Sequence, residues 1–156
     1  MRKGIITSMN TKEKLQFELK EALRSGDNIR KTTIRMALSS IKLAEVEKGS
    51  ALDEAGFINI IQKEIKIRQE AIQDGKKAAR PDLVDSNQAE INVLESFLPK
   101  QLTENDLKQI IIQVITEVQA TSPTDMGKVM KTLLPRVQGR APNDLVSRLV
   151  REILIK

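Results

Sequence analysis

The side chains with which this sequence could do chemistry are few in kind. The 156 residues include no Cys, His, Trp or Tyr, and the only aromatic residues are three Phe. Zinc sites built on thiolate or imidazole, Cys nucleophiles and His-based triads are therefore excluded. Any catalysis by this chain would have to use carboxylates, Lys, Ser or Thr.

Ser39 and Lys42 have the Ser-x-x-Lys spacing that places a serine nucleophile one helical turn from a lysine base. The Ser-Asp-Asn and Lys-Thr-Gly elements that accompany it in such hydrolases are missing, and Asp85-Ser86-Asn87 is only a permutation of the first. Because Leu38 and Ile41 supply the buried stripe of this segment, we expect Ser39 and Lys42 on or beside its solvated face. Only the spacing of Ser39 and Lys42 supports a Ser/Lys hydrolase, and we do not expect one.

Gly127-Lys128 resembles the end of a phosphate-binding loop. The first glycine of that motif would stand at position 122, which is Ser, and Val129 replaces the Ser or Thr that would hold magnesium. A nucleotide-hydrolysing P-loop is therefore excluded.

Two pairs of carboxylates, Asp53-Glu54 and Glu45 with Glu47, have residue types suited to general acid and base roles. We expect the first pair at a helix start and the second at an exposed helix end. The helix dipole and solubility explain acidic residues in such places. No pattern in the sequence demands catalysis, and no cofactor or metal site is predicted.

Basic residues are concentrated at the carboxyl end of the chain, whose formal net charge is +5 overall. A local excess of cations can dock a phosphate backbone, although a solvated face is the default for such residues. No aromatic residue follows Phe97, so recognition would use the backbone and shape of a nucleic acid, not base stacking. From Met126 onward the chain has only two acidic residues, Asp144 and Glu152. It has seven basic residues there, which are Lys128, Lys131, Arg136, Arg140, Arg148, Arg151 and Lys156.

Apolar residues recur at spacings of three and four along almost the whole chain, which predicts an all-α protein. Its helices are expected to begin at side-chain caps or at a proline in the first helical position, and to end at a glycine or before a proline. The expected starts are Asn10, Asp27, Asp53, Pro81, Thr103 and Ser122-Pro123, with a last helix after residues 139–142, and the expected stops include Gly26, Gly49, Gly75 and Pro99.

The same spacing predicts which apolar side chains face the core. On the first helix, Leu23 is expected to face inward together with Leu19. On the helix that follows Pro123, Leu134 is expected to do so together with Leu133. The second and third helices, joined by a short turn, are expected to form a hairpin.

Pro99 interrupts the pattern between two self-sufficient sets of apolar residues. We therefore expect an amino-terminal helical hairpin domain over residues 1–98, with a flexible tail at residues 1–9, and a carboxy-terminal three-helix domain over residues 99–156. The sequence holds no disulfide framework and no readable signal peptide or membrane span. These features favour a soluble intracellular protein without a membrane partner.

Gly127 is expected one or two residues into a helix, where glycine costs about 1 kcal/mol relative to Ala. Close helix packing, or the close approach of a ligand to the backbone, would explain it. We favour packing, because a conformationally costly glycine in a helix usually answers a packing need.

The most specific motif of the sequence is Asp125-Met126-Gly127-Lys128-Val129-Met130, followed by Gly139-Arg140. Further strings are Ile34-Arg35-Met36, Glu64-Ile65-Lys66-Ile67-Arg68, Arg80-Pro81-Asp82-Leu83 and Leu94-Glu95-Ser96-Phe97-Leu98-Pro99-Lys100-Gln101-Leu102. Together these strings resemble the YqeY family, and the resemblance runs from about Thr11 to the end of the chain.

What this resemblance implies is a carboxy-terminal helical module shared with the tail of the GatB subunit of the aspartyl/glutamyl-tRNA amidotransferase. The inherited family label is carbon–nitrogen ligase with glutamine as amido-nitrogen donor. In that amidotransferase the ammonia-producing and phosphorylating steps belong to other subunits and domains, while the tail module is implied to help hold tRNA.

We therefore predict an accessory module that binds tRNA or an aminoacyl-tRNA complex without chemistry of its own, in the cytoplasm or, as the family also has mitochondrial members, in the mitochondrion. The expected protein partners are an amidotransferase or other translation proteins. Two alternatives stay open, a protein-interaction module that uses the exposed face of the first hairpin and a catalytic amidotransferase component. The candidate nucleic-acid-binding residues are Lys128, Lys131, Arg136, Arg140 and Arg151.

Overall fold

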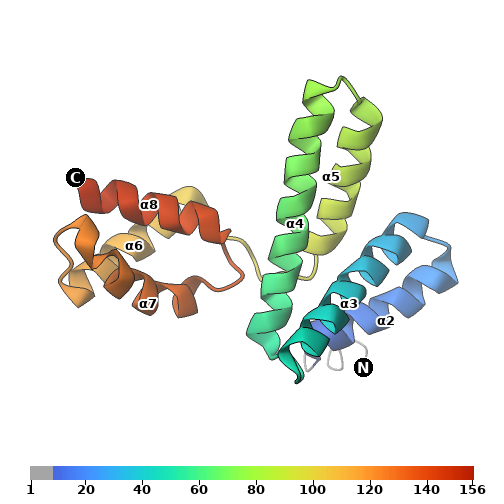
Figure 1. Ribbon diagram of the computed structural model, residues 1–156, viewed down its shortest axis with the longest axis horizontal. Helices are drawn as coiled ribbons and strands as arrows, with labels where there is room; N and C mark the ends of the chain where they lie inside the picture. The colour runs from blue at the N-terminus through green and yellow to red at the C-terminus, as the bar shows by residue number, and fades with distance from the viewer. Residues whose placement is uncertain (1–8) are drawn as a thin grey trace. The chain divides into compact units, whose positions relative to one another are not determined.

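The computed structural model describes residues 9–156, and every regular element in that range is a helix (Figure 1). The prediction of an all-α fold is confirmed. The predicted flexible tail at residues 1–9 falls, except for Met9, outside the described residues. The elements are α2 (Thr11–Ser25), α3 (Asn28–Lys48), α4 (Glu54–Lys77), α5 (Pro81–Glu95), α6 (Glu104–Val118), the 3₁₀ helix η1 (Pro123–Asp125), α7 (Met126–Val137) and α8 (Asn143–Ile155).

Short polar side chains begin four of these helices where the sequence predicts them. The side chain of Asn10 accepts a hydrogen bond from the backbone N–H of Glu13 at 2.8 Å. Asp27, Asp53 and Thr103 cap α3, α4 and α6 in the same way. Each acceptor satisfies a backbone N–H that the first helical turn leaves without a partner. These predicted caps are confirmed.

The described chain separates into two compact units, one ending at Leu98 and the other spanning Pro99–Lys156, which we call the amino-terminal and the carboxy-terminal unit. The amino-terminal unit holds α2 to α5. Within it α2 lies beside α3, and α4 lies beside α5 (Figure 1). Its core contains Leu15, Ile34, Ala37, Ile41, Phe57, Ile61, Ile65, Ile72, Ile91 and Leu94.

α4 packs most extensively against α5, and it contacts α3, its partner in the predicted hairpin, over a smaller area. Gly75 lies within α4, which continues to Lys77, so the prediction that Gly75 ends this helix is wrong. A Cβ atom at Gly75 would lie 3.2 Å from Val84 Cγ2 and 3.5 Å from Leu83 Cβ, both on α5. The glycine therefore lets these two helices approach each other closely.

Two apolar residues predicted to face the core are exposed, Leu23 by 50% and Leu134 by 38%. Successive helical residues are about 100° apart around the axis. Leu134 follows the fully buried Leu133 and therefore points away from the core line of α7. Leu23 stands in the same relation to the buried Ala22 on α2. Helical spacing predicts these two helices correctly but assigns one residue too many to the buried face of each.

The carboxy-terminal unit packs α6, η1, α7 and α8 around a core of its own. Before α6, the chain is tied to the turn between α7 and α8. Leu102 N donates to Arg140 O at 2.8 Å, and Gln101 Nε2 donates to Gly139 O at 2.6 Å. Residues 99–102 are therefore part of this unit. Its core residues are Leu107, Ile111, Val114, Val129, Leu133, Val137, Ala141, Val146, Leu149, Val150 and Leu154.

Candidate nucleic-acid interface

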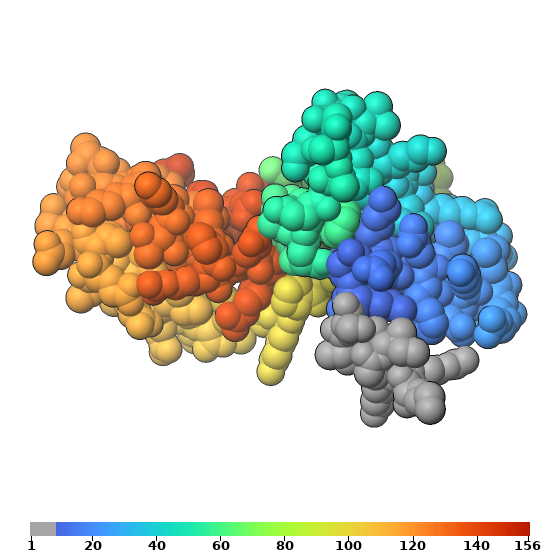
Figure 2. All heavy atoms as spheres, turned by 90° about the horizontal axis from the view of Figure 1, so that it is seen from below, coloured from blue at the N-terminus to red at the C-terminus, as the bar shows by residue number. Residues whose placement is uncertain are grey.

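The candidate interface is built on α7, a helix with two distinct faces. Val129, Leu133 and Val137, spaced four apart, are buried in the core of the carboxy-terminal unit. Atoms of η1 and α7 (orange) lie on the molecular surface shown in Figure 2. On the outer face, Lys128 and Lys131 are exposed. The alternation inside the Asp-Met-Gly-Lys-Val-Met string thus follows the helix: Val is buried, and Gly and Lys face solvent.

The start of α7 is fixed by the carboxylate of Asp125. Its Oδ2 accepts hydrogen bonds from the backbone N–H of Thr121 at 2.8 Å and of Ser122 at 3.4 Å. These backbone bonds, that of Thr121 first, together with the positive charge of Lys128, hold the pKa of Asp125 below its usual value. A charged Asp125 therefore closes the turn 121–125 and sets the direction in which α7 leaves it.

Gly127 has no packing partner among the described residues. A Cβ atom there would meet no heavy atom within 4 Å, and the residue is exposed. The prediction that close packing explains this glycine is therefore wrong, because the outer face of α7 carries no neighbouring element. Of the two predicted explanations, the approach of a ligand to the backbone is the one that stays open.

Four of the five predicted cations lie in three different settings. Lys128 and Lys131 share the outer face of α7, and Lys128 interacts electrostatically with Asp125. Arg140 is half-buried in the turn after α7, and Arg151 is exposed on α8. Within residues 9–156, the Lys131, Arg140 and Arg151 side chains make no hydrogen bond or ion pair. They are available to an external anion.

Arg136, the fifth predicted cation, is already engaged. Its guanidinium donates two hydrogen bonds to the carboxylate of Glu117 on α6, at 2.6 and 3.1 Å. This pairing lowers the pKa of Glu117 and raises that of Arg136. Arg136 therefore joins α6 to α7, and its charge is compensated within the unit.

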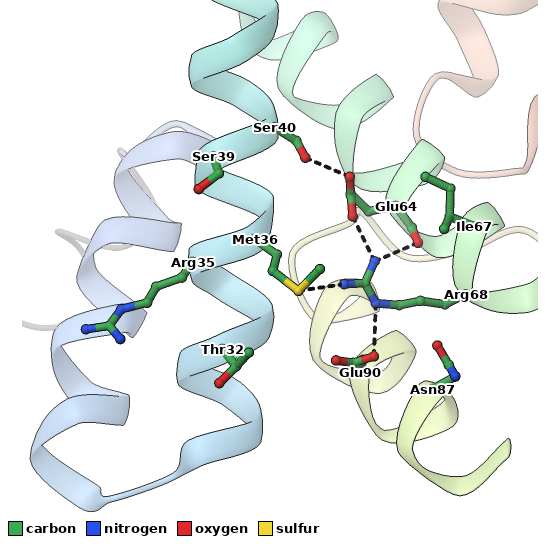
Figure 3. A pocket seen from close by; sticks show the side chains of 10 residues that line it. All are labelled: Thr32, Arg35, Met36, Ser39, Ser40, Glu64, Ile67, Arg68, Asn87 and Glu90. Atoms are coloured by element: carbon green, nitrogen blue, oxygen red, sulfur yellow. Dashed lines mark hydrogen bonds and ion pairs between the residues drawn. The ribbon is translucent and has the colours of Figure 1, made fainter. Parts of the chain in front are cut away.

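A second site, which sequence reasoning missed, is an open groove of about 640 Å³ between α3, α4 and α5 (Figure 3). At its base lies Arg68, whose side chain is only 5% exposed. Its Nη1 donates to Glu64 Oε2 at 2.8 Å, and its Nε lies 3.3 Å from Glu90 Oε2. Nη2 faces the sulfur of Met36 at 3.6 Å. The signal was present, since Arg68 falls on the spacing of the buried Ile61, Ile65 and Ile72.

The proposed serine–lysine pair is not assembled. Ser39 and Lys42 are both exposed, and no hydrogen bond joins them in the described chain. The neighbouring Ser40 hydroxyl donates instead to Glu64 Oε1 at 2.7 Å. Both serines line the groove, and Lys42 is not placed as a base for Ser39 in the described chain.

Three of the four carboxylates considered for catalysis, Asp53, Glu45 and Glu54, have structural partners. Glu45 accepts from Lys12 Nζ at 2.8 Å and from Leu52 N at 2.9 Å, and the pKa of Glu45 is lowered chiefly by the Lys12 bond. Glu54 binds the backbone and hydroxyl of Thr11. In the part of the chain that the structure describes, no three acidic side chains gather as metal ligands, and no helix is long and apolar enough to cross a membrane.

Comparisons with known proteins agree with the motif strings. Three similar proteins all carry the name "Altered inheritance of mitochondria protein 41, mitochondrial". The protein of Kluyveromyces lactis is 35% identical over 114 residues, which are 70% of this chain and 61% of the relative. That of Lachancea thermotolerans is 32% identical over 113 residues, 70% of this chain and 60% of the relative. That of Pyrenophora tritici-repentis is 26% identical over 144 residues, 90% of this chain and 79% of the relative.

The matched segments therefore span only about three fifths of the first two relatives. A family model described as "Yqey-like protein" matches residues 12–154, which is nearly the whole chain. This match includes all seven α-helices of the described residues except the ends of the first and last. The chain belongs to the YqeY family.

Proposed function

We propose that this protein binds tRNA, free or in an aminoacyl-tRNA complex, through its carboxy-terminal unit, and assists amidotransfer without an active site of its own. One observation carries the proposal. On the outer face of α7, Gly127 leaves the backbone open beside two exposed cations, Lys128 and Lys131.

This face suits a phosphate backbone for two reasons. Residues three apart on a helix lie on one side with Cβ atoms about 5–6 Å apart, so Lys128 and Lys131 can contact the same stretch of a strand. The missing side chain at Gly127 allows that strand to come near the helix. Arg140, whose side chain has no partner in the described residues, adds a third cation after the α7 turn.

The link to amidotransfer rests on the resemblance of the carboxy-terminal module to the tail of the GatB subunit. The relatives are named as mitochondrial proteins. We therefore include a mitochondrial location in the proposal, in preference to the cytoplasm, wherever the source organism has mitochondria.

The test is the salt dependence of tRNA binding by the full chain. Affinity for fluorescently labelled tRNA is measured by anisotropy over a range of KCl concentrations. Replacing Lys128, Lys131 and Arg140 together by Gln should weaken binding to every tRNA about equally and flatten the log–log salt slope by about 1 for each lost phosphate contact. The equal effect follows because backbone contacts do not read sequence.

The matched control replaces three exposed lysines of the amino-terminal unit by Gln, namely Lys20, Lys63 and Lys76. This control variant removes the same net charge. Its log–log salt slope should differ from that of the parent by less than the change expected for one phosphate contact. A Lys128/Lys131/Arg140 variant with the parent's affinity and slope would contradict tRNA binding by this face and favour the protein-interaction alternative.

A further inference from the structure

The helix α3 has a second apolar stripe on the face opposite its buried one. Four large apolar side chains on it are exposed: Ile29 by 53%, Met36 by 47%, Leu43 by 60% and Val46 by 69%. The first three are seven residues apart, and Val46 follows Leu43 by three. A seven-residue interval returns to the same side of a helix, as in one row of a helix–helix seam, and the positions between these apolar residues are the small polar Thr32 and Ser39. No element of the described chain covers this stripe.

The groove extends this stripe onto α4. Figure 3 shows the Met36 side chain pointing from α3 toward α4, where Ile67 and Arg68 line the opposite wall. Ile67 is itself 49% exposed. The end of α3 and the start of α4 (teal) lie at the molecular surface in Figure 2. The exposed apolar surface is therefore continuous from the stripe into the groove.

Two cations follow one edge of the stripe. Arg35 directly precedes Met36 and Lys42 directly precedes Leu43, so the seven-residue interval places both on the same side of α3. Both are exposed, and neither has a hydrogen-bond or ion-pair partner within residues 9–156. On the stripe's other side lie two carboxylates, Glu64 of α4 and Glu90 of α5, whose charge Arg68 already neutralises.

We propose that this face of α3 docks an amphipathic helix of a partner protein, with acidic residues along the edge that meets Arg35 and Lys42. The stripe from Ile29 to Val46 is about 26 Å long at 1.5 Å per residue, so the partner helix needs about five turns. Apolar side chains at seven-residue intervals would fill the seam, and the carboxylates would select the orientation.

A second copy of this chain is a poorer occupant. In an antiparallel two-fold pair, the edge with Arg35 and Lys42 would face its own copy, so that like charges oppose each other. In a parallel pair it would face the edge of α3 that carries Thr33 and Ser40. That edge is covered, since Thr33 is fully buried and Ser40 is bonded to Glu64 of α4.

The experiment uses the full chain and a designed probe. A fluorescein-labelled peptide of three heptads carries Leu at the seam positions and Glu along one edge; a matched peptide carries Lys in place of each Glu. Anisotropy should show that the acidic peptide binds with a dissociation constant of about 10–100 μM and the basic peptide about tenfold more weakly. Arg35→Glu with Lys42→Glu should reverse this preference.

Leu43→Glu places a charge in the seam and should weaken binding of the acidic peptide more than about tenfold. Leu43 is 60% exposed, so the variant should fold normally by circular dichroism. The matched control is Ile112→Glu on α6, at a residue that is 53% exposed and lies off the stripe, and it should bind like the parent.

Four results would overturn the inference. The two peptides could bind equally well, or neither could bind at millimolar concentration. Binding could be lost in the Lys128/Lys131/Arg140 variant and kept in Leu43→Glu, which would indicate general attraction to the carboxy-terminal cations. Equilibrium sedimentation could reveal a dimer that Leu43→Glu dissociates, which would make a second copy the occupant. Apart from the result with the Lys128/Lys131/Arg140 variant, which involves the same cations, these results do not bear on tRNA binding by α7.

Discussion

Arg68 in the amino-terminal unit and Lys131 in the carboxy-terminal unit are cations on amphipathic helices, but their surroundings are opposite. Arg68 is buried, and two carboxylates, Glu64 and Glu90, compensate its charge. Lys131 is exposed and unpaired within the described chain. A buried charge needs partners, whereas an exposed one keeps its hydration until a ligand displaces water. Position on the helix therefore separates an architectural cation from one available for binding.

Two helical glycines repeat this contrast. Gly75 is buried, and its missing side chain lets α5 approach α4. Gly127 is exposed, and its missing side chain leaves open space. The first glycine is explained inside the molecule, and the second is explained by what we propose to bind outside it.

Removal of the buried cation is expected to have the largest effect on stability. Arg68→Ala would leave Glu64 and Glu90 partly buried without their partner and should destabilise the amino-terminal unit by about 3 kcal/mol. Urea unfolding followed by circular dichroism, with amide exchange assigned to each unit, measures the loss. The control Lys63→Ala, at an exposed position on the same helix, should change stability by less than about 0.5 kcal/mol. A similarly small loss for Arg68→Ala would deny it an architectural role.

A smaller effect is expected on the stability of two excised fragments. Comparing these fragments tests whether the carboxy-terminal unit is an independent domain. A fragment of residues 99–156 should keep the helicity of α6 to α8. A fragment of residues 103–156 loses the bonds from Gln101 and Leu102 to Gly139 and Arg140. It should therefore be less stable by about 1–2 kcal/mol. Loss of helicity in the longer fragment would show that the unit depends on the rest of the chain.

The two glycines should respond to alanine with opposite signs. Gly127→Ala should raise stability by about 0.5 kcal/mol, because it adds helix propensity in open space. In Gly75→Ala the same gain is opposed by the contact at Val84, and we expect a net loss of about 1 kcal/mol. Thermal unfolding measures both. If Gly127→Ala gains stability yet binds tRNA like the parent, the glycine does not serve ligand approach.

The smallest effect concerns pH and the turn before α7. Because the folded pKa of Asp125 is lowered, its contribution to stability is complete above the pKa of an unfolded Asp and is lost as pH falls through the folded value. The urea midpoint should therefore fall less between pH 5 and pH 2 in Asp125→Asn than in the parent. Glu152→Gln is the control variant, and its urea midpoint should change with pH as that of the parent does. If a carbon-13 NMR titration gave Asp125 the pKa of an ordinary Asp, the lowered pKa could not be the cause of this pH dependence.

Helix boundaries and most of the core could be predicted because they depend on neighbours in sequence. The caps Asn10, Asp27, Asp53 and Thr103 bond to N–H groups three residues away. The buried stripes follow helical spacing, and the motif strings identified the family. These features need no knowledge of which helix lies beside which.

Contacts between distant helices could not be predicted in this way. The bond between Arg136 and Glu117 joins residues on two helices, and the close approach of α5 to α4 brings Val84 to Gly75. Gly127 was assigned to packing because a sequence does not show which helix face lacks a neighbour. Arg68 was missed although it falls on an apolar stripe, because a charge at such a position is uncommon.

The ion pairs of Arg68 bear on how the helices align along their lengths. A core of Ile and Leu side chains specifies helix register less sharply than a buried charge does, because aliphatic side chains can repack. Arg68 meets Glu90 in one register of α4 against α5. A slide by one turn, about 5.4 Å, would bury this cation away from Glu90. We infer that Arg68 discriminates against misaligned bundles, so that register is selected by charge where the aliphatic core is permissive.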